Sequence, residues 1–183
     1  MTRTATPAMD LTLRVASLTF DGTPARPLGE GSGDVIEAVH AHALTAVSAI
    51  QAGTASRALD MTVEYAKQRV QFGRTIGSFQ AIKHRLADMH VQAEIARTTT
   101  RAAAAALANG TGDRLELAAL AKITCSQALE TIAAETIQLH GGIAITWEHD
   151  AHLVFKRAHA LGELFGTARE LRGGAEETVL AAR

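Results

Sequence analysis

Apolar or small residues recur every three or four positions along most of the chain. In residues 34–67, where no proline interrupts the pattern, the repeating positions are Ile36, Ala43, Val47, Ile50, Thr54, Ala58, Met61 and Tyr65. In residues 79–109 they are Ile82, Leu86, Met89, Ala93, Ala96, Thr100, Ala103 and Leu107. This spacing places the repeating side chains on one face of an α-helix. We therefore predict two long helices, of residues 34–67 and 79–109.

The rest of the C-terminal part predicts three more helices. The longest covers residues 113–140 and ends at the glycine pair of residues 141–142, because glycine readily adopts the left-handed conformation that terminates helices. A shorter segment covers residues 149–161, and a final helix covers residues 167–181. Long helices joined by short connections favour an up-and-down bundle of the four-helix type.

The N-terminal region follows a different pattern. In residues 11–20, Leu11 and Leu13 alternate with polar residues, which predicts a β-strand. One strand cannot form a sheet alone, so it is either the remainder of a β-domain or an arm that pairs with something else. We expect a mostly α protein, with residues 1–33 as a short β-strand arm and linker and residues 34–183 as the helical domain.

Composition and charge exclude several classes of function. The net charge of −1 gives no electrostatic reason to bind nucleic acid or an anionic membrane. No run of apolar residues is long enough to predict a membrane span, and the first ten residues contain no readable secretory signal. The single cysteine, Cys125, rules out an internal disulfide and fits a reducing cytosol. We therefore expect a cytoplasmic protein.

The connection between the first two long helices carries unusual chemistry for a linker. Arg69 could clamp a phosphate through two hydrogen bonds. Phe72 and Phe79 could cover an apolar ring, and the amide of Gln80 could contact the edge of an adenine. The alternative is an ordinary connector whose phenylalanines plug the end of the bundle. The residues alone leave both interpretations open.

A second candidate lies at residues 138–142, with the sequence QLHGG. Gly141 and Gly142 would let the backbone approach a ligand closely, and Gln138 and His140 add polar groups. An ordinary glycine helix stop would explain the same residues.

Three weaker candidates complete the survey. The glycine-rich residues 29–34 could cradle a phosphate before a helix, but no alternation of strands and helices follows, so a flexible connection is favoured. The loop of residues 162–172 could offer the hydroxyl of Thr167, which we also predict as an N-cap, and its one internal carboxylate is Glu163. The histidines and Cys125 lack metal-site spacing, so we predict no metal site.

Taken together, these segments resemble the C-terminal helical domain of the acyl-CoA dehydrogenase family. The resemblance covers roughly residues 11–172 and includes the last strand of the family's β-domain. It rests on an Arg-x-x-Phe-Gly motif at residues 69–73, a Phe-Gln pair at residues 79–80, and a Gln-x-x-Gly-Gly motif at residues 138–142.

The resemblance implies a flavoprotein that oxidises the Cα–Cβ bond of an acyl-CoA thioester. In such proteins a carboxylate removes the α-proton and the flavin N5 of FAD accepts the β-hydride. The matching positions imply a set of FAD-contacting residues in this chain: Arg69, Phe72, Phe79, Gln80, Gln138, Gly141, Gly142 and Thr167.

The resemblance also gives these residues separate places on the cofactor. Arg69 matches an arginine at the FAD pyrophosphate, and residues 79–80 match positions near the adenine end. Residues 138–142 match the loop that holds the pyrophosphate of a neighbouring subunit's FAD, and Thr167 matches a threonine that also lies near FAD. Because such contacts cross a subunit interface, an oligomer is implied.

The chain departs from the family pattern where the proton is removed. The family is about twice as long, and its usual catalytic glutamate falls at Phe165. In members that carry the base on the first long helix, the matching position is Ala43, and the arginine that follows it falls at Leu44. None of these side chains accepts a proton, and Glu163 would need a shifted loop to substitute. No catalytic residue is therefore assigned.

Three interpretations follow. The chain could be a subunit that lacks a base and completes the FAD site of an acyl-CoA dehydrogenase partner. It could be a catalytically silent, truncated domain that folds and associates. It could also be a helical interaction module that contacts no flavin.

Overall fold

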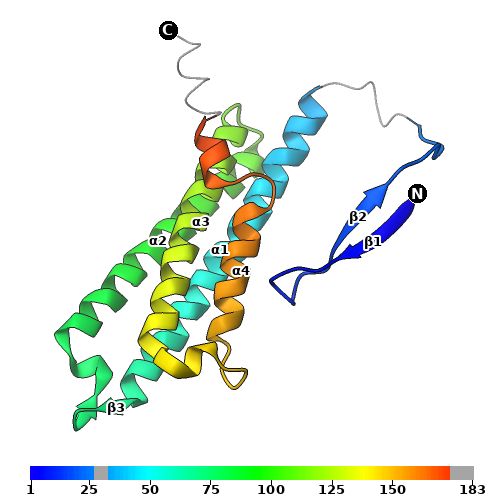
Figure 1. Cartoon of the computed structure of the whole chain (residues 1–183). Coiled ribbons are helices and arrows are strands. Elements are labelled where there is room, and N and C mark those ends of the chain that lie inside the picture. Colours follow the sequence, from blue (N-terminus) through cyan, green and yellow to red (C-terminus); the bar gives the residue numbers. More distant parts are fainter. Residues whose placement is uncertain (27–32, 174–183) are drawn as a thin grey trace.

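The computed structural model describes residues 1–26 and 33–173 (Figure 1). Four principal helices of this part pack side by side: α1 (Gly33–Gln68), α2 (Gln80–Asn109), α3 (Arg114–His140) and α4 (Ala151–Glu163). They form the up-and-down bundle that the sequence predicts, and each predicted boundary lies within two residues of the observed one.

The helix ends depend on a few specific residues. Gly141 ends α3, as predicted, and Gly110 ends α2; both have a positive φ. Asp113 occupies the N-cap position of α3, but its side chain makes no capping hydrogen bond.

Thr167 begins the last helical turn, residues 168–173, with a capping box. Its Oγ1 accepts the backbone N–H of Glu170 at 3.2 Å, and Glu170 Oε2 accepts the backbone N–H of Thr167 at 2.8 Å. The predicted continuation of this helix to residue 181, and most of the glycine-rich segment at residues 29–34, lie outside the described residues.

The N-terminal arm is a two-stranded antiparallel sheet. Strand β1 (Thr2–Thr6) pairs with β2 (Val15–Thr19) in a register that sets Thr2 opposite Thr19. The alternating pattern identified β2 but extended it too far, to residues 11–20. It missed β1, because every residue of both strands is exposed and the sequence of β1 shows no apolar alternation.

A buried carboxylate fastens the arm to the bundle. Asp10 is fully buried and accepts a hydrogen bond from the backbone N–H of Thr12 at 2.9 Å. Arg157 of α4 approaches the other carboxylate oxygen at 3.4 Å and also donates to the Thr12 hydroxyl. Burial alone would raise the pKa of Asp10, but the hydrogen bonds from Thr12 and the Arg157 guanidinium hold it below its usual value.

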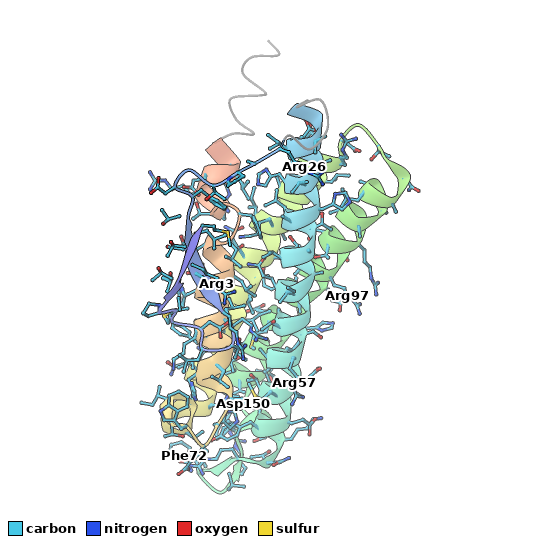
Figure 2. The ribbon with its side chains drawn as sticks, turned by 90° about the vertical axis from the view of Figure 1, so that its right-hand side faces the viewer. Arg3, Arg26, Arg57, Phe72, Arg97 and Asp150 are labelled. Atoms are coloured by element: carbon cyan, nitrogen blue, oxygen red, sulfur yellow. The ribbon has the colours of Figure 1, made fainter. Side chains whose placement is uncertain are left out.

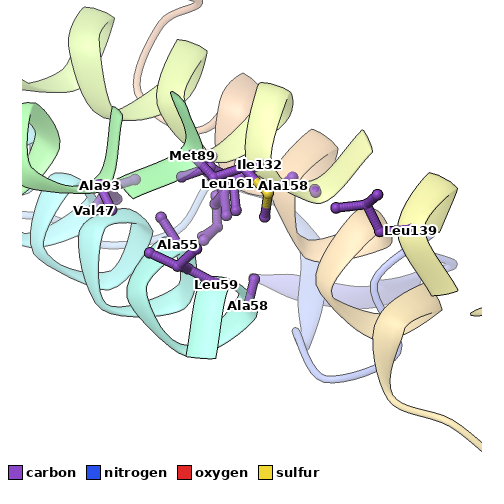
Figure 3. Close-up of a cluster of buried hydrophobic side chains, with 12 residues drawn as sticks. Val47, Ala55, Ala58, Leu59, Met89, Ala93, Ile132, Leu139, Ala158 and Leu161 are labelled. Atoms are coloured by element: carbon purple, nitrogen blue, oxygen red, sulfur yellow. The ribbon is translucent and has the colours of Figure 1, made fainter. Parts of the chain in front are cut away.

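The core runs along the middle of the bundle and combines a few large side chains with many alanines (Figure 3). Its large buried members are Val47, Leu59, Met89, Leu129, Ile132, Leu139 and Leu161. The repeating face of α2 is buried as its spacing predicted, from Met89 to Ala103.

The repeating face of α1 agrees less well with the prediction. Ile36 and Ile50 are 75% and 50% exposed. The buried face of α1 instead includes small polar residues such as Ser48 and Thr62. Their hydroxyls donate to the carbonyls four residues earlier, at 2.7 Å in each case, so they can be buried without an unsatisfied donor.

Candidate functional site

Two of the predicted segments meet at one end of the bundle. The connection from α1 to α2 and the C-terminus of α3 both lie at the lower end in Figure 1. The hydroxyl of Tyr65, near the end of α1, donates to the carbonyl of His140 at 3.2 Å. This bond joins the element that leads into Arg69 to the residue that precedes Gly141.

The connection itself is a small hairpin followed by one helical turn. Strand β3 (Val70–Gln71) pairs with β4 (Arg74–Thr75), and the 3₁₀-helix η1 (Ile76–Ser78) leads into α2. The two turn residues, Phe72 and Gly73, have φ values of 54° and 77°. Two successive positive φ values are typical of a type I′ turn, which prefers asparagine and glycine.

Phe72 is presented to solvent. Its side chain is 92% exposed, so it does not plug the end of the bundle, which was the alternative interpretation (Figure 2). Phe79 is half-buried and organises the loop. Its ring packs edge-on to Phe72 at 6.2 Å, and the guanidinium of Arg74 lies 4.0 Å above it.

Arg69 has an exposed side chain, and both polar groups of its backbone are hydrogen-bonded. Its N–H donates to the Tyr65 carbonyl and its carbonyl accepts the N–H of Ile76, both at 2.8 Å. Within the part of the chain that the structure describes, its guanidinium forms no ion pair. It is therefore available to bind an anion.

The end of α3 provides room for a ligand. Gly141 has a φ of 64°, and a Cβ atom built on Gly142 would meet no atom within 4 Å. Gln138 and Gln80, the first residue of α2, are both exposed. Exposed amide side chains and an accessible glycine backbone suit the polar atoms of a nucleotide.

Beneath this surface lies an aromatic stack that the sequence analysis did not find. The ring of His140 is 3% exposed and stacks on Tyr65 with 4.3 Å between centroids, while the ring of His149 is tilted against it at 4.4 Å. Its Nδ1 lies 2.7 Å from the carbonyl of Thr136, and its buried Nε2 has no partner in the described residues. Burial lowers the pKa of His140, and the nearby His149 lowers it further.

Gly77 is a second residue whose role the sequence did not reveal. A Cβ atom at this position would lie 2.9 Å from the backbone oxygen of Ala66. Only glycine therefore lets the connection pack this closely on α1. In the sequence, Gly77 stands only as part of the short stretch Thr-Ile-Gly-Ser. A glycine in such a stretch is equally typical of a simple turn, so the close packing could not be predicted.

The loop that follows α4 and contains Thr167 lies at the opposite end of the bundle (Figure 1). Helix α1 contains 36 residues, so its ends are about 54 Å apart. In this structure the hydroxyl of Thr167 donates to Glu170 Oε2 at 2.9 Å. The predicted cofactor residues thus form two groups, and Thr167 stands apart from the other seven.

Phe165 lies beside Thr167 in a left-handed conformation, with φ at 59° and its side chain 54% exposed. Its carbonyl lies 3.2 Å from Nε2 of His40. The alternative base position, Ala43, is half-buried, and Leu44 is fully buried. Glu163 is exposed at the end of α4 and has no hydrogen-bond partner among the described residues.

The described residues give no indication of two other kinds of feature, a membrane span and a metal site. None of the described helices is long and apolar enough to cross a membrane. Likewise, residues 1–26 and 33–173 contain no cluster of three or more histidine, cysteine, aspartate or glutamate side chains that could hold a metal ion.

The described part of the chain is thus an up-and-down bundle of helices with a two-stranded N-terminal arm. The family model "Acyl-CoA dehydrogenase, C-terminal domain" matches residues 29–174. The chain therefore belongs to the acyl-CoA dehydrogenase family, a family of FAD-dependent oxidoreductases, as its sequence motifs predicted.

Individual relatives support this assignment. Acyl-CoA dehydrogenase IpdE2 of Mycolicibacterium smegmatis is 45% identical over 164 residues, which are 90% of this chain and 49% of that protein. The chain thus spans about half the length of the curated relatives it matches.

Solved structures agree with this result. Butyryl-CoA dehydrogenase from Megasphaera elsdenii superposes with a TM-score of 0.91 and 30% identity, over 98% of this chain and 48% of that one. The ChsE4–ChsE5 complex from Mycobacterium tuberculosis superposes with a TM-score of 0.86 and 31% identity, over 97% and 49%.

Proposed function

We propose that this chain is a subunit that lacks its own base and completes the FAD site of an acyl-CoA dehydrogenase partner. The assembly would oxidise an acyl-CoA at Cα–Cβ, with FAD as the hydride acceptor. In this proposal residues 34–183 form the helical domain that contacts the cofactor, and residues 1–33 form the remainder of a β-domain and a linker.

The observation that carries the proposal is the exposed guanidinium of Arg69, which forms no ion pair in the described residues. It lies at the same end of the bundle as Gly141 and Gly142. The planar guanidinium of arginine binds two oxygens of a phosphate through paired hydrogen bonds. Gly141 and Gly142, which lack side chains, would let the backbone approach the same pyrophosphate closely. Phe79 and Gln80 would face the adenine end, and Phe72, at the exposed turn, would cover an apolar part of the cofactor.

The position of Thr167 supports contact with more than one cofactor molecule. It lies at the far end of the bundle from Arg69, so the two residues would serve different FAD molecules in an oligomer. Its hydroxyl would have to exchange its present bond to Glu170 for a bond to the ligand.

The absence of a base supports dependence on a partner. Phe165 and Ala43 occupy the two positions where family members carry the carboxylate, and neither accepts a proton. The ChsE4–ChsE5 complex supports a partner of the same family, since that solved relative contains two different chains. We further propose a cytoplasmic location, which the free and buried Cys125 supports.

The test is flavin content measured with and without a partner. The chain is purified alone with added FAD, and after co-expression with acyl-CoA dehydrogenase subunits from its own genome. Flavin absorbance should appear only in the co-expressed complex. Arg69→Ala should then lower the flavin content about tenfold, which corresponds to the loss of a hydrogen bond to a charged group.

Arg101→Ala is the matched control, because Arg101 is exposed on α2 and forms no ion pair in the described residues. The proposal fails if the chain binds FAD alone, or if Arg69→Ala and Arg101→Ala retain equal flavin. A stable complex that never contains FAD would instead favour a silent interaction module.

A further inference from the structure

Lys122 is an unusual residue in the interior of this bundle. It lies in the N-terminal half of α3 and is fully buried, and no carboxylate in the described residues forms an ion pair with it. Burial lowers the pKa of its amine, although the nearby Glu163 partly opposes this effect. A buried amine is costly unless all of its N–H groups find acceptors.

Three oxygen atoms surround the amine. One is Oγ of Ser126, at 3.0 Å, on the next turn of α3. The other two are the carbonyls of Gly162 and Gly166, at 2.9 and 3.2 Å. These glycines bracket the loop between α4 and the capping box of Thr167, at the upper end of the bundle in Figure 1.

The same loop has a strained backbone. Phe165 has a φ of 59° and Gly166 a φ of 108°, so a bulky residue adopts a conformation that glycine normally provides. Such a conformation persists only where the surroundings impose it. The amine of Lys122, on α3, donates to the carbonyls of Gly162 and Gly166. The ring of His40, on α1, contacts the carbonyl of Phe165 at 3.2 Å.

We propose that Lys122 is a positioning residue, which fixes the loop of residues 162–166 and thereby presents the side chain of Phe165 at the protein surface. An apolar side chain of similar length would fill the same space in the core. Lysine is required because the loop carbonyls turn inward and need donors there. This proposal concerns the chain itself and does not depend on flavin or on a partner.

The first test is hydrogen exchange on the full chain, followed by mass spectrometry. Lys122→Met keeps the length of the side chain but removes all three donors. Amides of residues 162–168 should exchange at least about tenfold faster, while those in the centres of α1, α2 and α3 remain protected. Lys83→Met, at an exposed position of α2, is the control and should change neither region.

Unchanged exchange in residues 162–168 of Lys122→Met would overturn the proposal. Equal acceleration throughout the bundle would also overturn it, because Lys122 would then support the whole core and not the loop.

A second measurement needs no variant and therefore does not depend on whether Lys122→Met folds. In the wild-type chain, labelled with ¹⁵N and ¹³C, the Lys122 amine should give a slowly exchanging signal with couplings through hydrogen bonds to the Gly162 and Gly166 carbonyls. A rapidly exchanging amine without these couplings would contradict the assignment. The spectroscopic signature separates a positioning contact from simple burial of the side chain.

Discussion

Tyr65 and His140 join the two halves of the candidate cofactor site. The Tyr65 hydroxyl donates to the His140 carbonyl at 3.2 Å, and the two rings stack 4.3 Å apart. We expect Tyr65→Phe, which keeps the stacked ring, to lower the free energy of unfolding by about 1 kcal/mol. Tyr65→Leu should cost more, because it also removes the aromatic contact. Urea unfolding measures both, and equal effects would mean that the stacking contributes nothing.

The bundle could be predicted from the sequence because the signals for each helix lie within the helix itself and at its ends. The regular spacing from Met89 to Ala103 defines a helix face without knowledge of its neighbours, and Gly110 and Gly141 end helices by their own conformational freedom. The exposed strand β1 carries no such pattern, so it was missed.

The contacts of the candidate site were less accessible to sequence reasoning. Motifs indicated Arg69 and Gln138, but no local pattern connects Tyr65 to His140 or Lys122 to Gly162. Those pairs are far apart in the chain and meet only once the helices have packed. Gly77 is similar, since its need for a hydrogen in place of Cβ arises from the carbonyl of Ala66.

The glycine at position 77 gives a steric prediction. In Gly77→Ala the new Cβ would lie 2.9 Å from the Ala66 carbonyl oxygen, so the backbone must move. We expect a loss of about 1–3 kcal/mol in the free energy of unfolding, as for other overpacked sites. Gly112→Ala is the control, because a Cβ there meets nothing within 4 Å. The same urea midpoint for both variants would show that the connection adjusts freely.

The buried ring of His140 predicts a dependence of stability on pH. Burial lowers its pKa from the usual 6.5, so the unfolded chain takes up a proton at a higher pH than the folded one. The contribution of His140 to the free energy of unfolding is therefore fully present above the pKa of the unfolded chain. It is lost as the pH drops through about 6.5 towards the pKa of the folded chain.

Urea unfolding between pH 7.5 and about 5.5 measures this loss, within the range where histidine titrates. His140→Asn should reduce the slope, whereas His84→Asn, at an exposed position, should leave it unchanged. An identical slope in His140→Asn and the wild type would assign the effect to another group.

The contact between Asp10 and Arg157 predicts how the arm is held. Asp10→Ala removes the buried carboxylate that accepts from Thr12 and Arg157, so the arm should detach while the helices remain folded. Brief trypsin digestion should then cleave after Arg14 faster than in the wild type, with unchanged helical circular dichroism. Asp21→Ala, at an exposed position just beyond β2, is the control. Equal cleavage rates would indicate that the arm is held by other contacts.

Phe72 predicts opposite effects on stability and on function. Its left-handed φ of 54° is unfavourable for a bulky residue, and its exposed ring gains little from packing in the isolated chain. Phe72→Asn creates an Asn-Gly pair, the preferred sequence for a type I′ turn, and should raise the free energy of unfolding by about 1 kcal/mol.

If Phe72 covers part of the cofactor, the same variant should lower the flavin content of the co-expressed complex. Gln71→Asn, which changes a polar residue outside the turn, should alter neither quantity. A variant that is more stable and retains its flavin would show that the exposed ring serves another purpose than contact with FAD.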